Sequence, residues 1–174
     1  MSLGALVSRA DRALEQLIRV YSLLCSAVLV VMALGTVVSI TGRALIPIGF
    51  GPIPGDFELI EMGAAIAVFS FLPICHLGRG HVTVDIITDA SPRWLGNIFT
   101  VLGDALILII AAVMARQLWF GLLDKMRYGE TTMLLGVPVW YGYLFSVIGA
   151  ALFLLAALMV LGRDAAKILH GERL

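Results

Sequence analysis

Four long apolar segments divide the chain, and short polar or glycine- and proline-rich stretches separate them. The segments cover about residues 19–45, 57–77, 94–123 and 138–162, and each carries few charges. About 20 consecutive apolar residues in a helix cross the hydrocarbon core of a bilayer, so each segment is long enough to span a membrane. The runs are continuous rather than alternating, which indicates helices and not barrel strands. We therefore predict an all-α integral membrane protein whose four transmembrane helices form a single membrane domain, residues 1–174.

Residues 3–18, before the first span, follow a different pattern. Apolar side chains recur there at helical spacing, and Arg9, Arg12 and Glu15 lie between them. This amphipathic pattern is typical of an interfacial helix that lies on the bilayer surface, and we predict such a helix at the N-terminus. A cytoplasmic extension of the first span would show the same pattern, so both interpretations stay open.

Composition agrees with a membrane protein and argues against nucleic acid as a partner. About 60% of the residues are apolar and 14% are charged, whereas soluble domains have roughly 45–50% and about 25%. Twelve basic and twelve acidic residues give no net charge, so we expect no binding to nucleic acid. The two cysteines, Cys25 and Cys75, both lie in apolar segments, where we interpret them as packed thiols.

Basic residues are unevenly distributed between the two sides of the four spans. The side that holds both termini has eight, and the other side has four. The eight are Arg9, Arg12, Arg19, Arg79, Arg93, Arg163, Lys167 and Arg173, and the four are Arg43, Arg116, Lys125 and Arg127. Since lysine and arginine concentrate on the cytoplasmic side, we predict that both termini are cytoplasmic.

Acidic residues within the spans are candidate functional residues, because a charge in lipid needs a partner or a watery lining. Asp104 lies about ten residues into the third span. A polar contact to another helix or subunit is preferred over an ion relay, which would show several ionisable groups at matching depths. Glu58 and Glu61 share a helix face. Helix capping, or an ion pair with Arg43 or a partner subunit, explains them better than a metal site, since no histidine is nearby.

Nothing in the sequence is typical of an enzyme. The histidines His76, His81 and His170 form no pair of axial haem ligands within the spans. Neither a nucleophile with its base nor a nucleotide-binding motif is visible. We predict no catalysis, no cofactor and no metal. An anchor subunit of an enzyme complex, or a small independent exporter that uses Asp104, remain the alternatives to a transport subunit.

Two motifs carry a family resemblance. The first begins at Glu61-Met62-Gly63-Ala64-Ala65, passes through Phe69-Ser70-Phe71-Leu72-Pro73 and ends with His76-Leu77-Gly78-Arg79-Gly80-His81-Val82-Thr83-Val84-Asp85. The second is Gly129-Glu130-Thr131-Thr132-Met133-Leu134-Leu135-Gly136-Val137-Pro138-Val139-Trp140. In this order between the spans, they resemble the small membrane subunit of tripartite ATP-independent periplasmic (TRAP) transporters, the DctQ family. The resemblance covers about residues 10–165. The segment 49–55 departs from it by being richer in glycine and proline.

The resemblance implies a non-catalytic scaffold in the bacterial inner membrane. Its partners would be a large membrane subunit with a moving elevator domain, a periplasmic substrate-binding protein, and phospholipids. Uptake of an organic acid, such as a dicarboxylate, keto acid or sialic acid, would be driven by sodium.

Several residues gain expected roles from this resemblance. The segment from His76 through His81 to Asp85 would be a cytoplasmic turn, with Arg79 on lipid phosphate or the large subunit and Asp85 accepting hydrogen bonds. The segment from Glu130 through Pro138 to Trp140 would form a periplasmic rim anchored by the tryptophan. Lys125 and Arg127 would face the binding protein.

Overall fold

The computed structural model describes residues 3–78 and 93–169, and long helices make up most of this part of the chain. They are α1 (Leu3–Ala44), α2 (Asp56–Leu77), α4 (Arg93–Tyr128) and α5 (Trp140–Leu169), with a short 3-10 helix, η1 (Ile46–Ile48), after α1. By length and composition, each long helix contains a segment able to cross a membrane. The predicted all-α membrane protein with four spanning helices is confirmed.

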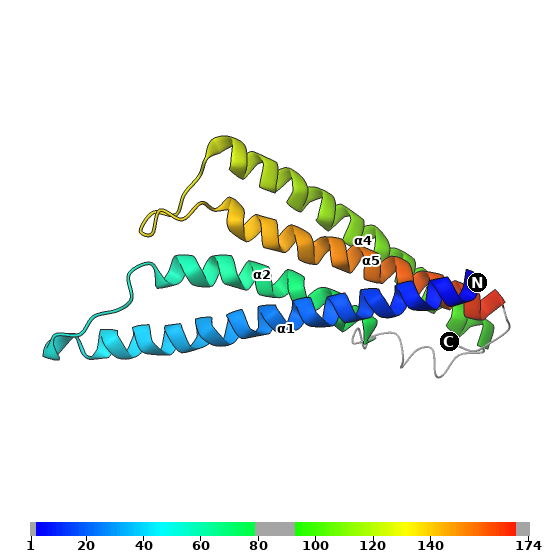
Figure 1. Cartoon of the computed structure of the whole chain (residues 1–174), viewed down its shortest axis with the longest axis horizontal. Coiled ribbons are helices and arrows are strands. Elements are labelled where there is room, and N and C mark those ends of the chain that lie inside the picture. Colours follow the sequence, from blue (N-terminus) through cyan, green and yellow to red (C-terminus); the bar gives the residue numbers. More distant parts are fainter. Residues whose placement is uncertain (1–2, 79–92, 170–174) are drawn as a thin grey trace.

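Helix α1 joins the amphipathic N-terminal segment and the first predicted span in one element. Its 42 residues correspond to about 63 Å at a rise of 1.5 Å per residue, about twice the thickness of a bilayer core. No proline or glycine interrupts it between Gly4 and Gly35, and Figure 1 shows no sharp bend. This geometry is that of an extension of the first span, the second of the two interpretations given above.

Glycines and prolines between α1 and α2 end the first helix and set the start of the second. Pro47 lacks an N–H and disfavours helix at the residue before it, so α1 gives way to the short turn η1. Gly49 and Gly55 take the left-handed conformation, with φ of 93° and 77°. Helix α2 then begins at Asp56 and continues through Pro73, which is buried within it.

The last two helices are longer than the spans predicted from the sequence. Helix α4 continues beyond residue 123 to Tyr128, and α5 begins at Trp140 and continues beyond residue 162 to Leu169. Both extensions carry charged residues, so they lie outside the apolar runs from which the spans were predicted. The borders of the membrane along these helices stay predictions.

The helices lie side by side in the order α1, α2, α5, α4. Within the described residues, α2 packs against both α1 and α5, α5 packs against α4, and α1 also contacts α5, whereas α4 contacts neither α1 nor α2. The arrangement is therefore an open layer rather than a closed four-helix bundle. Figure 1 shows the helices close together at the end where both termini lie and spread apart at the other end.

Small residues allow the closest helix contacts. A Cβ atom added at Gly149 of α5 would lie 2.5 Å from the backbone oxygen of Phe69 in α2. One added at Gly63 of α2 would collide with the end of the Met32 side chain in α1. Close backbone approach through glycine is a common way for helices to associate in lipid. Single glycine positions thus decide how closely these helices approach each other.

The small residues on α2 and α5 are divided between buried and exposed faces. On α2, Gly63 and Ala67 are buried; on α5, Gly149, Ala150, Ala156 and Ala157 are buried. Their neighbours Ala64, Ala65 and Ala151 are exposed. Part of this small-residue surface therefore packs within the chain, and part of it stays exposed.

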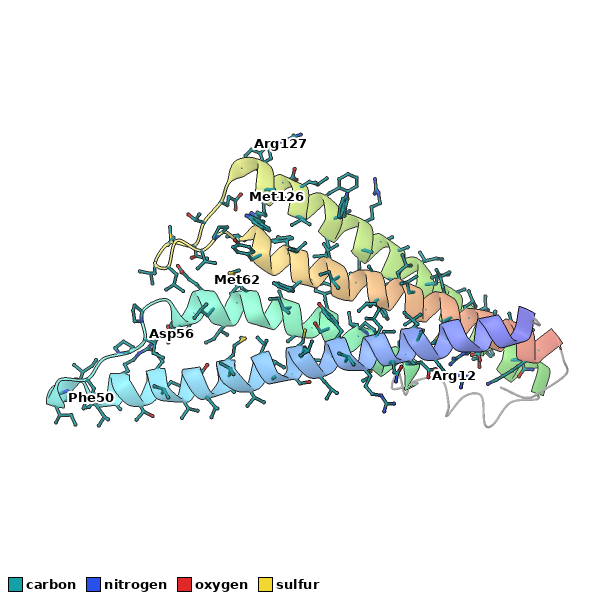
Figure 2. The ribbon with its side chains drawn as sticks, in the orientation of Figure 1. Arg12, Phe50, Asp56, Met62, Met126 and Arg127 are labelled. Carbon is teal, nitrogen blue, oxygen red and sulfur yellow. The ribbon has the colours of Figure 1, made fainter. Side chains whose placement is uncertain are left out.

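Two buried clusters lie toward the end that holds the termini. One joins Ile18 of α1 to Leu152 and Ala156 of α5, and the other joins Ala111 of α4 to Phe153 and Ala157 of α5. Half of the apolar segment of α5 is buried, against 22% in α2 and 11% in α1 and α4, and α5 is the helix that contacts all three of the other long helices. At the spread end, Figure 2 shows Phe50 and Arg127 far apart, while Arg12 lies at the opposite end.

Candidate functional site

A short hairpin connects α4 to α5 at the spread end of the layer. The Thr132 amide donates to the Val137 carbonyl (2.9 Å), and the Val139 amide donates to the Glu130 carbonyl (3.0 Å). Gly136 adopts a φ of 65° within the turn, a value that glycine takes without steric cost. Residues 129–139 thus form a structured connection, here called the rim hairpin.

Glu58 fastens the rim hairpin to the start of α2. Its Oε1 accepts from the Leu134 amide (2.7 Å), and its Oε2 accepts from the Leu135 amide (3.0 Å). The Leu135 side chain also lies close to Gly55, where a Cβ atom would collide with it. Hydrogen bonds to an ionised carboxylate are stronger than neutral ones. Glu58 therefore holds the hairpin tip and does not pair with Arg43.

Arg43 instead meets Asp56, at the junction of α1 and α2. The Ser39 hydroxyl donates to Asp56 Oδ2 (2.5 Å), and Arg43 Nη2 lies 3.5 Å from the same oxygen. Ser39 also accepts from the Ile53 amide (3.2 Å), and the Phe57 amide donates to Asp56 Oδ1 (2.9 Å). Sequence reasoning missed Ser39 and Asp56. The only signal was an aspartate at the first helical position, directly after Pro54-Gly55.

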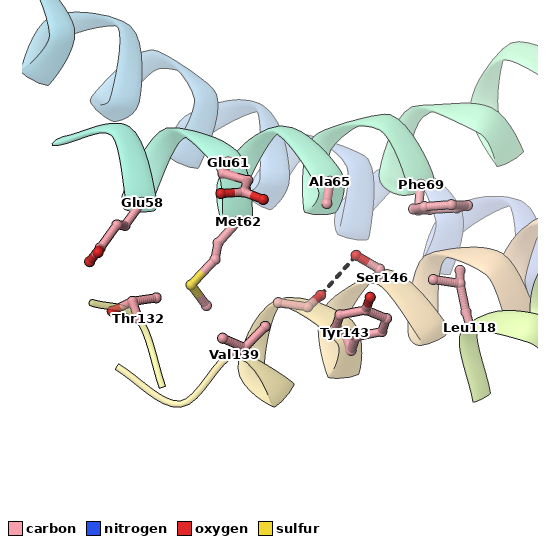
Figure 3. A pocket seen from close by; sticks show the side chains of 11 residues that line it. Glu58, Glu61, Met62, Ala65, Phe69, Leu118, Thr132, Val139, Tyr143 and Ser146 are labelled. Carbon is pink, nitrogen blue, oxygen red and sulfur yellow. Dashed lines mark hydrogen bonds between the residues drawn. The ribbon is translucent and has the colours of Figure 1, made fainter. Parts of the chain in front are cut away.

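A small pocket lies between α2, α5 and the rim hairpin (Figure 3). It encloses about 330 Å³, and its lining is mainly apolar. At the edge of the pocket, Glu58 points toward the rim hairpin, and Glu61 lies one turn further along α2 (Figure 3). The Ser146 hydroxyl on its wall donates to the Gly142 carbonyl within α5 (2.8 Å). In residues 3–78 and 93–169, no group of three or more His, Cys, Asp or Glu is placed to hold a metal ion.

The remaining candidate residues of the rim are largely engaged with one another. Lys125 Nζ forms an ion pair with Glu130 Oε2 (2.5 Å). The Pro138 carbonyl accepts from the Tyr141 amide (3.3 Å) at the start of α5. The Trp140 and Tyr141 rings stack with centroids 4.1 Å apart. Lys125 is thus committed within the chain, which leaves Arg127 as the more available of the two predicted docking cations.

At the end that holds the termini, α1 and α5 are tied together by charge. Arg163 of α5 contacts Asp11 through Nε (3.1 Å) and Glu15 through Nη1 (2.8 Å). The Tyr21 hydroxyl of α1 donates to the Phe145 carbonyl of α5 (2.7 Å). These contacts join positions more than 120 residues apart, and no sequence pattern marked them.

Between α1 and α2 a further hydrogen bond is buried. The Ser22 hydroxyl donates to the Ser70 carbonyl (2.8 Å), and Ser70 donates to the Ile66 carbonyl of its own helix (2.6 Å). Hydroxyl groups that bond across helices are a recurrent contact in membrane proteins. The described charged and polar contacts therefore connect helices and loops, and none assembles a reaction centre.

Comparison with known proteins places the chain. Residues 32–167, more than three quarters of its 174 residues, match the family described as tripartite ATP-independent periplasmic transporters, DctQ component. The chain belongs to the DctQ family. It is therefore the small membrane subunit of a TRAP transporter, a transporter component, as the two sequence motifs indicated. A search of curated proteins finds no match.

Asp104 of this DctQ chain is buried in α4, eleven residues after the helix begins at Arg93. Ala111 of α4 packs against Phe153 of α5. Because these two helices run antiparallel, Asp104, seven residues before Ala111, is level with about Val160. Arg163 follows only three residues later on α5. Asp104 is buried against the layer, with 9% of its surface exposed, so it belongs to the helix packing of the subunit.

The turn motif of the DctQ resemblance is only partly described. His76 is buried in the last turn of α2, with its ring edge-on to Phe153 at a centroid distance of 5.8 Å. It packs against α5 and does not begin an exposed turn, because α2 continues to Leu77. Arg79, His81 and Asp85 lie outside the described residues.

The two cysteines differ in environment. Cys25 is buried in α1, in agreement with a packed thiol, whereas Cys75 is exposed on α2. The interpretation of Cys75 as packed was wrong within this chain, because its side chain is exposed among the described residues.

Proposed function

We propose that this subunit is the static scaffold of a sodium-coupled TRAP importer of organic acids in the bacterial inner membrane. It would stabilise the large elevator subunit and help the periplasmic binding protein to dock. Membership of the DctQ family over residues 32–167 carries the proposal. The substrate and the sodium ions would bind to the other subunits.

The fold supports a static role. Helix α2 is tied to the rim hairpin through Glu58, and α1 is tied to α5 through Arg163. Between these ends, Gly149 brings the α5 backbone against α2. Contacts at both ends and in the middle resist sliding of one helix along another, which is what a fixed frame requires.

The orientation of the proposed scaffold follows from charge. Both termini would be cytoplasmic, since eight of the twelve basic residues belong to that side under the four-span topology. Figure 1 shows the N-terminal end of α1 and the C-terminal end of α5 at the same end of the layer. The rim hairpin and the segment 45–55 would then face the periplasm.

The rim hairpin is the proposed contact for the binding protein. Met133 and Leu134 at its tip are 99% and 73% exposed, and Glu58 holds the backbone beneath them. Arg127 lies in the last turn of α4, six residues before Met133. An apolar tip whose backbone is hydrogen-bonded to Glu58 suits recognition of a soluble partner, because little ordering entropy is lost on binding.

A pull-down of the tagged chain from its host in mild detergent tests the proposal. Mass spectrometry is expected to find a large multi-span membrane protein in stoichiometric amount. After reconstitution of both membrane subunits in liposomes, an inward sodium gradient should drive organic-acid uptake only when the binding protein is added. Recovery of the chain alone as a homo-oligomer would contradict the scaffold role.

The docking role has a separate test with a matched control. Met133→Ser removes the exposed apolar tip and should weaken binding of the binding protein by about tenfold, the equivalent of 1.4 kcal/mol. Ile48→Ser changes a side chain that is 68% exposed on the other connecting segment, and it should leave binding unchanged. Equal effects of the two substitutions would argue against the hairpin as the contact.

A further inference from the structure

An apolar groove of about 580 Å³ lies between α1 and α2, in the half of the layer nearest the segment 45–55. It exists because α1 contacts α5 only through its first half, around Ile18 and Tyr21. Beyond that, α2 is its only neighbour among the described helices. Gly35 widens the groove further, since no atom lies within 4 Å of where its Cβ would be.

The length of the groove matches one leaflet of a bilayer. On α2 its lining begins at Asp56 and ends at Ile66, ten residues or about 15 Å along the helix. The hydrocarbon core of a bilayer is about 30 Å thick, so one leaflet contributes about 15 Å. The groove therefore begins at a charged end and stops near the middle of the membrane.

The walls of the groove suit hydrocarbon. Val31 and Leu59 line its two sides, and Met32 lies against Gly63 between the helices. The Thr36 hydroxyl on the α1 wall donates to the Met32 carbonyl (2.9 Å), so its one donor is used within α1. Water in such a groove would lack polar partners, whereas an acyl chain would lose nothing.

A cation lies at the charged end. Arg43 contacts Asp56, which lines the groove, but the Arg43 side chain is still 48% exposed and its guanidinium lies over the Phe57 ring at 5.7 Å. A guanidinium has five donors and matches phosphate geometry well. The groove could thus hold the apolar tail of an amphiphile while Arg43 contacts its anionic headgroup.

We propose that the α1–α2 groove is a phospholipid site, in which an acyl chain lies between the helices and the phosphate contacts Arg43. Such a lipid would complete the packing of the C-terminal half of α1, where α2 is the one long helix beside it among the described residues. The inference goes beyond the scaffold proposal and requires only that the four helices span a membrane.

Native mass spectrometry of the full chain tests this site directly. The chain would be reconstituted in nanodiscs of phosphatidylethanolamine and phosphatidylglycerol, released in mild detergent, and its bound phospholipids counted. Gly35→Trp fills the groove without a backbone clash and should lower occupancy by about tenfold or more, which corresponds to 1.4 kcal/mol. Arg43→Gln should reduce retention of phospholipid while leaving the groove open.

Val30→Trp is the matched control, because Val30 is 58% exposed on α1 and does not line the groove. It should retain lipid like the unmodified chain. Equal lipid retention by Gly35→Trp and Val30→Trp would overturn the proposal. So would efficient photo-cross-linking from residue 31 to the large subunit in the intact complex, since a protein helix would then occupy the groove. The lipid-retention result does not depend on the large subunit, and the cross-link would support the scaffold proposal while overturning the lipid site, so the two proposals fail under different outcomes.

Discussion

Gly149 is the position where a single methyl group should most disturb the layer. In Gly149→Ala the new Cβ would lie 2.5 Å from the Phe69 oxygen and 2.7 Å from the Phe69 carbonyl carbon. Ordinary contacts begin near 3.4 Å, so α2 and α5 must separate by about 1 Å or distort. Both Phe69 atoms belong to the backbone and cannot rotate away. Overpacking of this kind costs about 1–3 kcal/mol.

Part of that cost is offset by helix propensity. Alanine is favoured over glycine inside a helix by about 0.5–1 kcal/mol, so Gly149→Ala should lower the free energy of unfolding by up to about 2.5 kcal/mol. The assay is unfolding of the purified chain in mixed micelles with increasing dodecyl sulfate, followed by circular dichroism. A lower midpoint is expected.

Two other glycines supply controls. Gly162→Ala lies in the same helix with nothing within 4 Å of the new atom, and it should be neutral or stabilising by up to about 1 kcal/mol. Gly63→Ala meets the flexible end of Met32, which can move, so its effect should lie between the others. If Gly149→Ala unfolds at the same midpoint as Gly162→Ala, the close α2–α5 contact is refuted.

Three further substitutions test the ties between elements. Glu58→Gln should speed hydrogen exchange of the two hairpin amides that donate to Glu58, on the order of tenfold. Glu61→Gln should leave the exchange rates of these amides unchanged. Equal rates in both variants would show that the hairpin does not depend on Glu58. Arg163→Gln should lower the unfolding free energy by about 0.2–1 kcal/mol at low salt and by less at high salt, and a salt-independent loss would point to packing instead. Ser39→Ala removes a buried hydroxyl that donates to Asp56 and accepts from a backbone amide, and it should cost about 1 kcal/mol in the same unfolding assay; an unchanged midpoint would contradict that hydrogen-bond pair.

The number and type of helices could be predicted from the sequence, but their order in space could not. An apolar run longer than about 20 residues is enough to indicate a spanning helix. In lipid, however, a residue that faces another helix and one that faces acyl chains are both apolar, so the pattern does not mark which faces meet. Val31 on the groove and Val30 on the outer surface illustrate this, since both are exposed apolar residues of α1.

The polar candidates show the same limit for single residues. Glu58 was singled out from the sequence, but its partners lie 76 and 77 residues away in the rim hairpin, and no helical spacing connects them. Asp104 was assigned a depth by counting from the start of its span. Helix α4, at 36 residues, is longer than a bilayer core requires, so position in the sequence does not give depth. The packing of α4 against α5 adds the neighbour, because it brings Asp104 level with about Val160, three residues before Arg163.

An open layer suits the proposed scaffold role better than a compact bundle would. Neighbouring helix axes lie about 8–10 Å apart, so four helices in a row extend about 24–30 Å from the first axis to the last, while a closed bundle of four has about half that width. The wider frame leaves both faces of the central helices α2 and α5 available to a partner or to lipid. It also removes the contacts that α1 and α4 would make in a bundle. The layer then depends on the contacts that remain: Gly149 joins α5 to α2, Arg163 joins α5 to α1, and Glu58 joins α2 to the rim hairpin.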